Sequence, residues 1–235
     1  MQALEMQSTE GGGRMRITQN VWQVGGSGLT APEDAGIYLI RFGEAAALID
    51  AGCGEAAQKL FANIAKALPE TLPITHLFLT HCHFDHSGGA EAVRQRYGCK
   101  VAAHQLDAVF LEKGDSDVTA ASWYGSRMQP LGIDHKIVDS REAIRVGSGE
   151  IFAYHCPGHS PGSLVYVAEV DGQRVLFGQD IHGPLHADLL SNRSDYVRSL
   201  GFIVELNADI LCEGHFGVFR GSAEIRRFIE SYLSP

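Results

Sequence analysis

The segment from Thr80 to Ala90, THCHFDHSGGA, places three histidines and one aspartate within six positions. Imidazole nitrogens and carboxylate oxygens are common zinc ligands, and they must converge to about 2.0–2.2 Å from the ion. His81 and His83 alternate with Cys82 and Phe84, so an extended start sends both imidazoles to the same side. Asp85 and His86 follow as the chain turns. The segment therefore predicts a metal site.

Three more candidate ligands stand singly, each close to a glycine and at the end of an expected strand. They are His159 in CPGHSPGS, Asp180 in LFGQDIHG and His215 in LCEGHFG. Segments at strand ends often carry binding groups on a rigid scaffold. A lone histidine is weak evidence by itself, so these three gain their meaning from the cluster at 81–86. We expect all seven side chains to meet.

Other reactive side chains have a more ordinary interpretation. Strand alternation turns Cys82 away from the site, so we expect it, like Cys156, to pack in the core. His182 lies just beyond Asp180 and is a candidate for contact with the substrate. Four histidines outside the pattern are expected to be structural: His76, His104, His135 and His155. The sequence leaves open whether three large side chains line a substrate pocket or only pack: Trp123, Tyr124 and Met128.

The segment GHSPG, from Gly158 to Gly162, also fits the GxSxG pattern of serine hydrolases. Pro161 follows the serine and has no N–H to offer an oxyanion. The next residues, SLVYVAEV, are strand-like, whereas that motif requires a helix. The sequence therefore argues against serine catalysis.

The order His81-x-His83-x-Asp85-His86, followed by single His159, Asp180 and His215, resembles the metallo-β-lactamase fold hydrolases, especially their glyoxalase II-like branch. All seven ligand positions match in type and order, and the resemblance covers roughly residues 15–235. It implies an α/β (α+β) fold, the αββα four-layer sandwich, with the metals at one edge of the two sheets.

The resemblance also implies how the ligands divide between two divalent ions. The first ion would be held by His81, His83 and His159, and the second by Asp85, His86 and His215. Asp180 would bridge them, which makes chemical sense because two oxygens and a negative charge can span two cations that otherwise repel. Zinc is expected first, and iron or manganese also suit such ligands.

Two divalent ions about 3.5–4 Å apart can share a water and lower its pKa toward neutrality. The predicted activity is therefore hydrolysis by a hydroxide held between two metals, with Asp85 as the catalytic residue that orients it. No general acid is evident in the sequence. A thiolate, with an ordinary pKa of about 8.5, can leave without one. Small-molecule thioesters are the favoured substrates, with activated esters and lactones next.

Three other functions stay open. Persulfide dioxygenases resemble the same pattern, but they use a single iron to activate oxygen. Phosphodiesterase or ribonuclease relatives hold RNA with an additional basic arm or domain, which is not visible here. A non-catalytic ligand-binding member of the fold has no need of a complete ligand set. Only twenty residues follow His215, so we do not expect the helical domain with which glyoxalase II enzymes grip glutathione.

Hydrophobic patterning predicts two sheets with helices outside. Expected strands of the first half are 14–18, 21–24, 36–42, 45–50 and 74–80. Expected strands of the second half are 143–146, 150–156, 163–170, 174–178 and the start of 208–215, with a hairpin turn at Asp171 and Gly172. Helices are expected over 55–68, 90–98, 194–206 and 222–233, the last with Ser222 as its cap. Residues 104–139 are predicted to form a helical excursion.

The chain has 235 residues and is 45% hydrophobic, which is enough for one domain over 14–235 after a flexible leader at 1–13. A formal charge of −9 argues against nucleic acid as a partner. No apolar run approaches the roughly 20 residues of a membrane helix, and no signal peptide is evident, so we expect a cytoplasmic protein. The five cysteines form no CxxC pair and are expected to be free. The sequence leaves a homodimer open.

Overall fold

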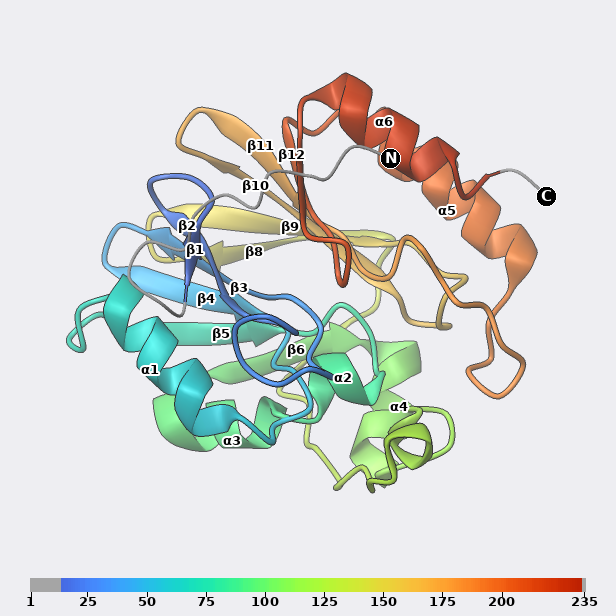
Figure 1. Ribbon diagram of the computed structural model, residues 1–235, viewed down its shortest axis with the longest axis horizontal. Helices are drawn as coiled ribbons and strands as arrows, with labels where there is room; N and C mark the ends of the chain where they lie inside the picture. Colours follow the sequence, from blue (N-terminus) through green and yellow to red (C-terminus); the bar gives the residue numbers. More distant parts are fainter. Residues whose placement is uncertain (1–13, 234–235) are drawn as a thin grey trace.

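The computed structural model describes residues 14–233, in which two β-sheets lie face to face (Figure 1). The first sheet runs in the order β1 (Met15–Arg16), β2 (Val21–Gly25), β3 (Ile37–Phe42), β4 (Ala45–Ile49), β5 (Ile74–Phe78), β6 (Lys100–His104) and β7 (His135–Ile137). The second runs in the order β13 (Val218–Arg220), β12 (Ile210–Cys212), β11 (Gln173–Phe177), β10 (Leu164–Val170), β9 (Gly149–His155) and β8 (Arg141–Val146).

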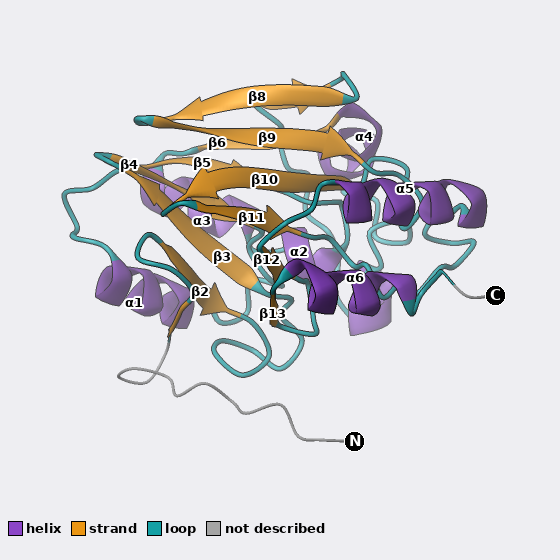
Figure 2. Ribbon diagram, turned by 90° about the horizontal axis from the view of Figure 1, so that it is seen from above, coloured by secondary structure: helices purple, strands orange, loops and turns teal. Residues whose placement is uncertain are grey.

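Helices cover the outer face of each sheet. The helices are α1 (Ala57–Ala67), α2 (Phe84–Ser87), α3 (Ala90–Tyr97), α4 (Gln105–Lys113), α5 (Arg193–Glu205) and α6 (Ser222–Glu230), with a 3₁₀ turn η1 (Ala121–Tyr124). In Figure 1, α1 and α3 lie on one side of the sheet pair and α5 and α6 on the other. Figure 2 shows α5 and α6 side by side over the second sheet.

Side-chain alternation explains why both faces of each sheet are buried. In β3, Tyr38 and Ile40 enter the core between the sheets, whereas Leu39 enters the core under α1 and α3. In β10, Tyr166 faces the core between the sheets and Val165 faces the core under α5 and α6. Because successive residues of a strand point to opposite faces, each strand supplies two cores. The predicted αββα fold is confirmed.

Two buried tyrosines connect the central core to the edge where strands β5 and β12 end. Tyr166 packs on Phe78 with ring centroids 5.2 Å apart, and its hydroxyl donates to the carbonyl oxygen of Leu79 at 2.8 Å. The Tyr38 hydroxyl donates to the carbonyl oxygen of Glu213 at 2.6 Å. Both accepting residues lie just before segments that carry predicted ligands. The core thus fixes where those segments begin.

Most expected elements are present with bounds that agree within about two residues, and the hairpin turn at Asp171 and Gly172 is present, with both residues at positive φ. The sequence missed β6 and β13. The expected helical excursion at 104–139 is wrong in part, because it includes β7, which pairs in parallel with β6. Ser222 is not a cap: it is the first residue of α6, and Gly221 precedes it at φ 86°.

The core shared by the two sheets supports our proposal that residues 14–235 form one domain. The predicted leader at 1–13 lies outside the described residues. All five cysteines are free and buried, as expected. Between residues 14 and 233, no helix combines the length and apolar character needed to cross a membrane.

Replacing Tyr166 with phenylalanine removes a hydroxyl that satisfies a buried carbonyl group. We expect the free energy of unfolding to fall by about 1–3 kcal/mol, because the Leu79 carbonyl oxygen loses its donor without access to water. Urea denaturation measures the change, and Tyr232→Phe, at a partly exposed tyrosine of the C-terminal segment, is the matched control. Equal stability of Tyr166→Phe and wild type would contradict this role of the hydroxyl.

Candidate metal centre

The segment predicted to bind metal leaves β5 and turns at once into α2. His83 precedes α2 in an extended conformation, with φ −65° and ψ 147°. The rings of His81 and His83 lie 4.4 Å apart between centroids, so the two imidazoles do point to the same place. Asp85 and His86 are on α2 and are buried with it.

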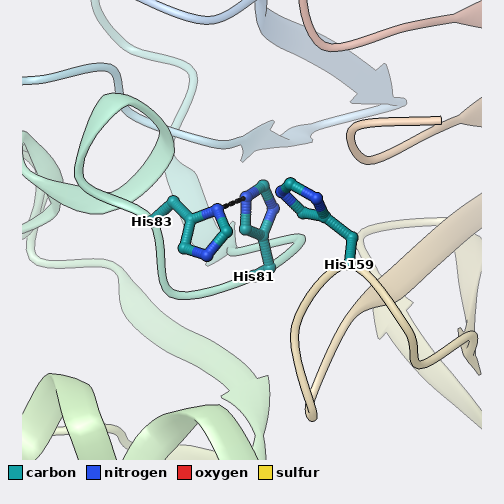
Figure 3. Close-up of side chains that lie close together, drawn as sticks. All are labelled: His81, His83 and His159. Atoms are coloured by element: carbon teal, nitrogen blue, oxygen red, sulfur yellow. Dashed lines mark hydrogen bonds between the residues drawn. The ribbon is translucent and has the colours of Figure 1, made fainter. Parts of the chain in front are cut away.

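Three histidines form the first group of convergent side chains (Figure 3). His81 Nε2 lies 2.9 Å from His83 Nδ1. His159, from the loop between β9 and β10, brings its ring to 4.7 Å from His81 and 4.5 Å from His83. All three side chains are buried, and each offers a nitrogen within 4.8 Å of the other two.

The second group consists of Asp85, His86, Asp180 and His215, again with ligand atoms within 4.8 Å of one another. His215 Nε2 lies 3.1 Å from Asp85 Oδ2 and 3.4 Å from Asp180 Oδ2. Asp180 follows β11, and His215 follows β12. These two strands are parallel neighbours, so their carboxyl ends present both residues at the same sheet edge.

Asp180 lies where the two groups meet. Its Oδ1 is 2.9 Å from His86 Nε2, and its Oδ2 is 3.4 Å from His159 Nε2. Space for this carboxylate depends on Gly214, because a Cβ at that position would come within 2.3 Å of Asp180 Oδ1. The seven residues predicted from the sequence are therefore all brought together in the structure.

Electrostatics divide the histidines into two classes. Burial, with neighbouring imidazoles, lowers the pKa of His81, and it lowers the pKa of His83 to about 3. Burial also lowers the pKa of His159. Burial alone would lower the pKa of His215, but Asp180 and Asp85 outweigh it and raise the pKa to about 10. The first group thus favours neutral imidazole, the form that binds metal, and the second attracts positive charge.

The unpaired polar atoms of the site fit a bound cation. Among the buried side-chain atoms of residues 14–233 that have no hydrogen-bond partner, four belong to the two ligand groups: His83 Nε2, His86 Nε2, His159 Nε2 and Asp180 Oδ1. His86 Nε2 and Asp180 Oδ1 are close, but they are not aligned as a hydrogen bond. Buried polar atoms are nearly always satisfied in native proteins. Their concentration in a set of imidazoles and carboxylates fits zinc or a related divalent ion.

Asp50 orients one of the histidines and was not identified from the sequence. It follows β4 directly, at φ 62°, and its Oδ2 lies 2.7 Å from His86 Nδ1. The same carboxylate accepts the Thr80 N–H and the Thr80 hydroxyl, each at 2.8 Å. A carboxylate on Nδ1 leaves Nε2 of the imidazole free to bind metal. The available signal was an aspartate directly after the apolar strand AAALI.

Asp107 joins the two loops that carry the first group. This fully buried residue of α4 accepts the Cys82 N–H at 2.9 Å through Oδ2 and the Gly162 N–H at 2.6 Å through Oδ1. Its Oδ2 also accepts the Ser160 hydroxyl at 2.7 Å. Ser160, the serine of the GxSxG pattern, is therefore a buried donor, which agrees with the argument against serine catalysis.

Glu213 joins the two loops that carry Asp180 and His215 of the second group. It is fully buried, and its Oε2 accepts the N–H groups of His215 at 2.7 Å and Phe216 at 2.8 Å. Its Oε1 accepts the Ile181 N–H at 3.1 Å and lies 3.0 Å from His182 Nδ1. One carboxylate thus fixes the segments next to Asp180 and His215. His182 lies beside the site, and its contact with substrate stays a prediction.

The other cysteines, histidines and large side chains considered in the sequence lie outside the two ligand groups. Cys82 and Cys156 are buried in core clusters, as expected. The four histidines predicted to be structural lie outside both groups: His76 stacks on Phe78, His104 stacks on His155, and His135 pairs with Glu142. Met128 is buried in the core, whereas Trp123 and Tyr124 are exposed. The Tyr124 ring lies 5.9 Å from Phe84, next to the ligand segment.

The chain belongs to the metallo-beta-lactamase superfamily, whose family model matches residues 33–215. The acyl-coenzyme A thioesterase MBLAC2 of Gallus gallus is 29% identical over 226 residues, covering 85% of this chain and 78% of that protein. The hydroxyacylglutathione hydrolase of Rhodospirillum rubrum is 29% identical over 132 residues, covering 55% of this chain and 41% of that protein. The second match agrees with the glyoxalase II-like resemblance.

Solved structures agree on the fold. A metallo-beta-lactamase of Cronobacter sakazakii has a TM-score of 0.78 with 21% identity, covering 93% of this chain and 90% of that one. The superfamily and the named relatives support a hydrolase with a divalent metal site.

Replacing Glu213 with glutamine tests the role of its carboxylate as a positioning group. The amide presents a donor where the carboxylate accepts N–H groups, so we expect metal affinity and kcat each to fall about 10–100-fold. Competition with a chromophoric chelator measures metal affinity independently of turnover. The matched control is Glu142→Gln, at a partly exposed carboxylate paired with His135. Wild-type metal affinity in Glu213→Gln would show that these bonds do not position the ligands.

Proposed function

We propose that the protein is a metal-dependent hydrolase of small-molecule thioesters, with activated esters and lactones as slower substrates. The observation that carries the proposal is the position of Asp180, whose carboxylate lies 2.9 Å from His86 of the second group and 3.4 Å from His159 of the first. A second, complete group beside three histidines favours two ions over one. The thioesterase name of the Gallus gallus relative supports the substrate class.

The proposed ligands of the first ion are His81, His83 and His159, and those of the second are Asp85, His86 and His215, with Asp180 shared. When bound, two such ions lower the pKa of a water toward neutrality and polarise a carbonyl group. Zinc is the expected metal, with iron or manganese as alternatives.

Asp85 is the proposed catalytic residue. Although burial alone raises the pKa of this carboxyl group, His86 and His215 outweigh it and lower the pKa, so Asp85 is ionised near neutrality. An ionised carboxylate at this position can accept a hydrogen bond from the attacking water and orient its lone pair toward the substrate carbonyl carbon.

Tyr124, which the sequence left open as a residue of the substrate pocket, is the proposed hydrogen-bond donor. Burial, followed by the charge of Asp85, raises the pKa of its hydroxyl, so the phenol keeps its proton at neutral pH. Its side chain is 39% exposed, which leaves it accessible to a substrate at the site. We assign it the role of donating a hydrogen bond to the substrate. A thiolate leaves without further proton donation, whereas an alkoxide would need it.

The charge of the protein fits a small uncharged acyl group better than a polyanion. The formal net charge is −9. Phosphate backbones are held by clustered cationic side chains. We therefore propose that neither RNA nor DNA is the substrate.

Removal of the metals should abolish hydrolysis, and re-addition should restore it. Protein prepared without chelators should contain about two divalent ions per chain by elemental analysis, and Asp180→Ala should lose at least one of them with a 100-fold or greater loss of kcat, because its charge no longer offsets two cations. His135→Ala, at a histidine outside the site, is the control and should keep both ions.

The substrate panel should include thioesters, lactones, phosphodiesters, β-lactams and a persulfide. Turnover of thioesters by two-metal protein without oxygen uptake supports the proposal. Two-metal protein that cleaves none of the esters, together with iron protein that consumes oxygen with the persulfide, would replace it with a dioxygenase function.

Tyr124→Phe removes only the hydroxyl group. We expect kcat for thioesters to fall about tenfold with a smaller change in KM, because a hydrogen bond to developing charge acts mainly in the transition state. Steady-state kinetics at saturating metal separate the two constants, and Tyr97→Phe, at a tyrosine of α3, is the control. An unchanged kcat would remove Tyr124 from the catalytic residues.

A further inference from the structure

A cavity of about 300 Å³ lies directly beside the second ligand group. One wall is the segment 26–36 between β2 and β3, and the other is the segment 214–217 that carries His215. The two walls are bonded to each other, since the Gly36 N–H donates to the Gly214 carbonyl oxygen at 2.6 Å. The Ala35 N–H also donates to the Asp85 carbonyl oxygen at 3.1 Å. Because His215 both lines the cavity and belongs to the second ligand group, the cavity adjoins the proposed metal centre.

The chemistry of the lining favours an apolar, uncharged occupant. Five of the eleven lining residues are glycines, and Met15 and Leu29 supply apolar side chains. The one lining carboxylate, Asp34, is already bonded by the Thr30 hydroxyl and by the N–H groups of Ala31 and Cys53. No lysine or arginine lines the cavity.

A second hollow, by Trp123, does not offer the same environment. It is lined by Asp117, Ser122, Trp123 and Asp188, and its two carboxylates disfavour an alkyl chain. Only one of these two hollows includes a proposed metal ligand in its lining, namely His215.

We propose that the cavity between segments 26–36 and 214–217 is the binding site for the acyl chain of the substrate. The proposal rests on the hydrolase function and specifies its substrate class as medium-chain acyl thioesters. A volume of about 300 Å³ has room for on the order of eight to ten chain atoms, given about 30 Å³ for each water-sized group. The carbonyl end of such a chain lies at His215, and the thiol moiety extends away from the cavity.

A larger side chain can be introduced at the mouth of the cavity, at Gly28, without disturbing the walls. Gly28 is exposed and lines the cavity, and a Cβ added there meets no atom within 4 Å. Its backbone lies outside the positive-φ region, so a larger residue introduces no backbone strain. Gly201 on α5 shares both properties but lies away from the cavity, which makes Gly201→Leu a matched control for Gly28→Leu.

The first measurement is kcat/KM of metal-loaded protein for a series of N-acetylcysteamine thioesters, from acetyl to decanoyl. The reaction is monitored by the thiol that it releases. Each buried methylene should raise kcat/KM about threefold to fourfold, so octanoyl should exceed acetyl by at least about 100-fold. Gly28→Leu should reduce the octanoyl to acetyl ratio at least tenfold, whereas Gly201→Leu should keep the wild-type ratio. A ratio near one in wild type, or an unchanged ratio in Gly28→Leu, overturns the acyl site and leaves the hydrolase function intact.

The second measurement is binding of octanoate and acetate by calorimetry, which needs no turnover. Octanoate should bind wild type at least tenfold more tightly than acetate, and Gly28→Leu should remove this difference. If no thioester is cleaved but octanoate keeps this preference, the hydrolase function fails and the apolar chain site stands. Equal affinity for octanoate and acetate overturns the site whatever the activity.

Discussion

The geometry of the site depends on buried carboxylates that hold pairs of loops. A buried carboxylate without partners is strongly unfavourable, so its oxygens must accept several hydrogen bonds. Asp107 meets this requirement with donors from the segments 80–83 and 160–162, and Glu213 with donors from 181–182 and 215–216. Each carboxylate needs the hydrogen-bond donors of both segments to offset its burial. The two segments are therefore expected to become ordered together. This coupling makes the relative position of ligands distant in sequence a property of the folded core.

The same site concentrates negative charge around two imidazoles. Asp50, Asp85 and Asp180 all raise the pKa of His86 against the effect of burial. Carboxylates this close repel one another unless positive charge lies between them. A protonated histidine or a bound cation can supply that charge, and the two compete for the same nitrogen atoms. Metal binding at such a site releases protons and adds to stability. Fold and proposed cofactor are therefore energetically linked.

The ligands were accessible to sequence reasoning because four of them are clustered in six residues and the rest follow a known order. The positioning acids were not, because their partners are distant in sequence: Asp107 and Gly162 are 55 positions apart. Nothing in a local window distinguishes Asp107 from any other helical aspartate. Strand β6, KVAAH, is short and was missed because its pairing with β5 and β7 supplies the stability that its pattern does not show. Gly221 occupies the cap position of α6 at a positive φ. A glycine in the sequence is compatible with a positive φ but does not establish it.

One segment serves both the proposed chemistry and the proposed choice of substrate. Residues 214–217 carry a ligand, His215, and also form a wall of the apolar cavity. Gly214 has no Cβ and so leaves space for the Asp180 carboxylate. Its carbonyl oxygen accepts a hydrogen bond from the Gly36 N–H of the opposite wall. A chain in the cavity would therefore contact the segment that positions His215. Binding energy from the remote part of a substrate can in this way be used to orient the reacting carbonyl, which raises kcat as well as affinity. No lysine or arginine lines the cavity, so its walls away from His215 suit an apolar chain.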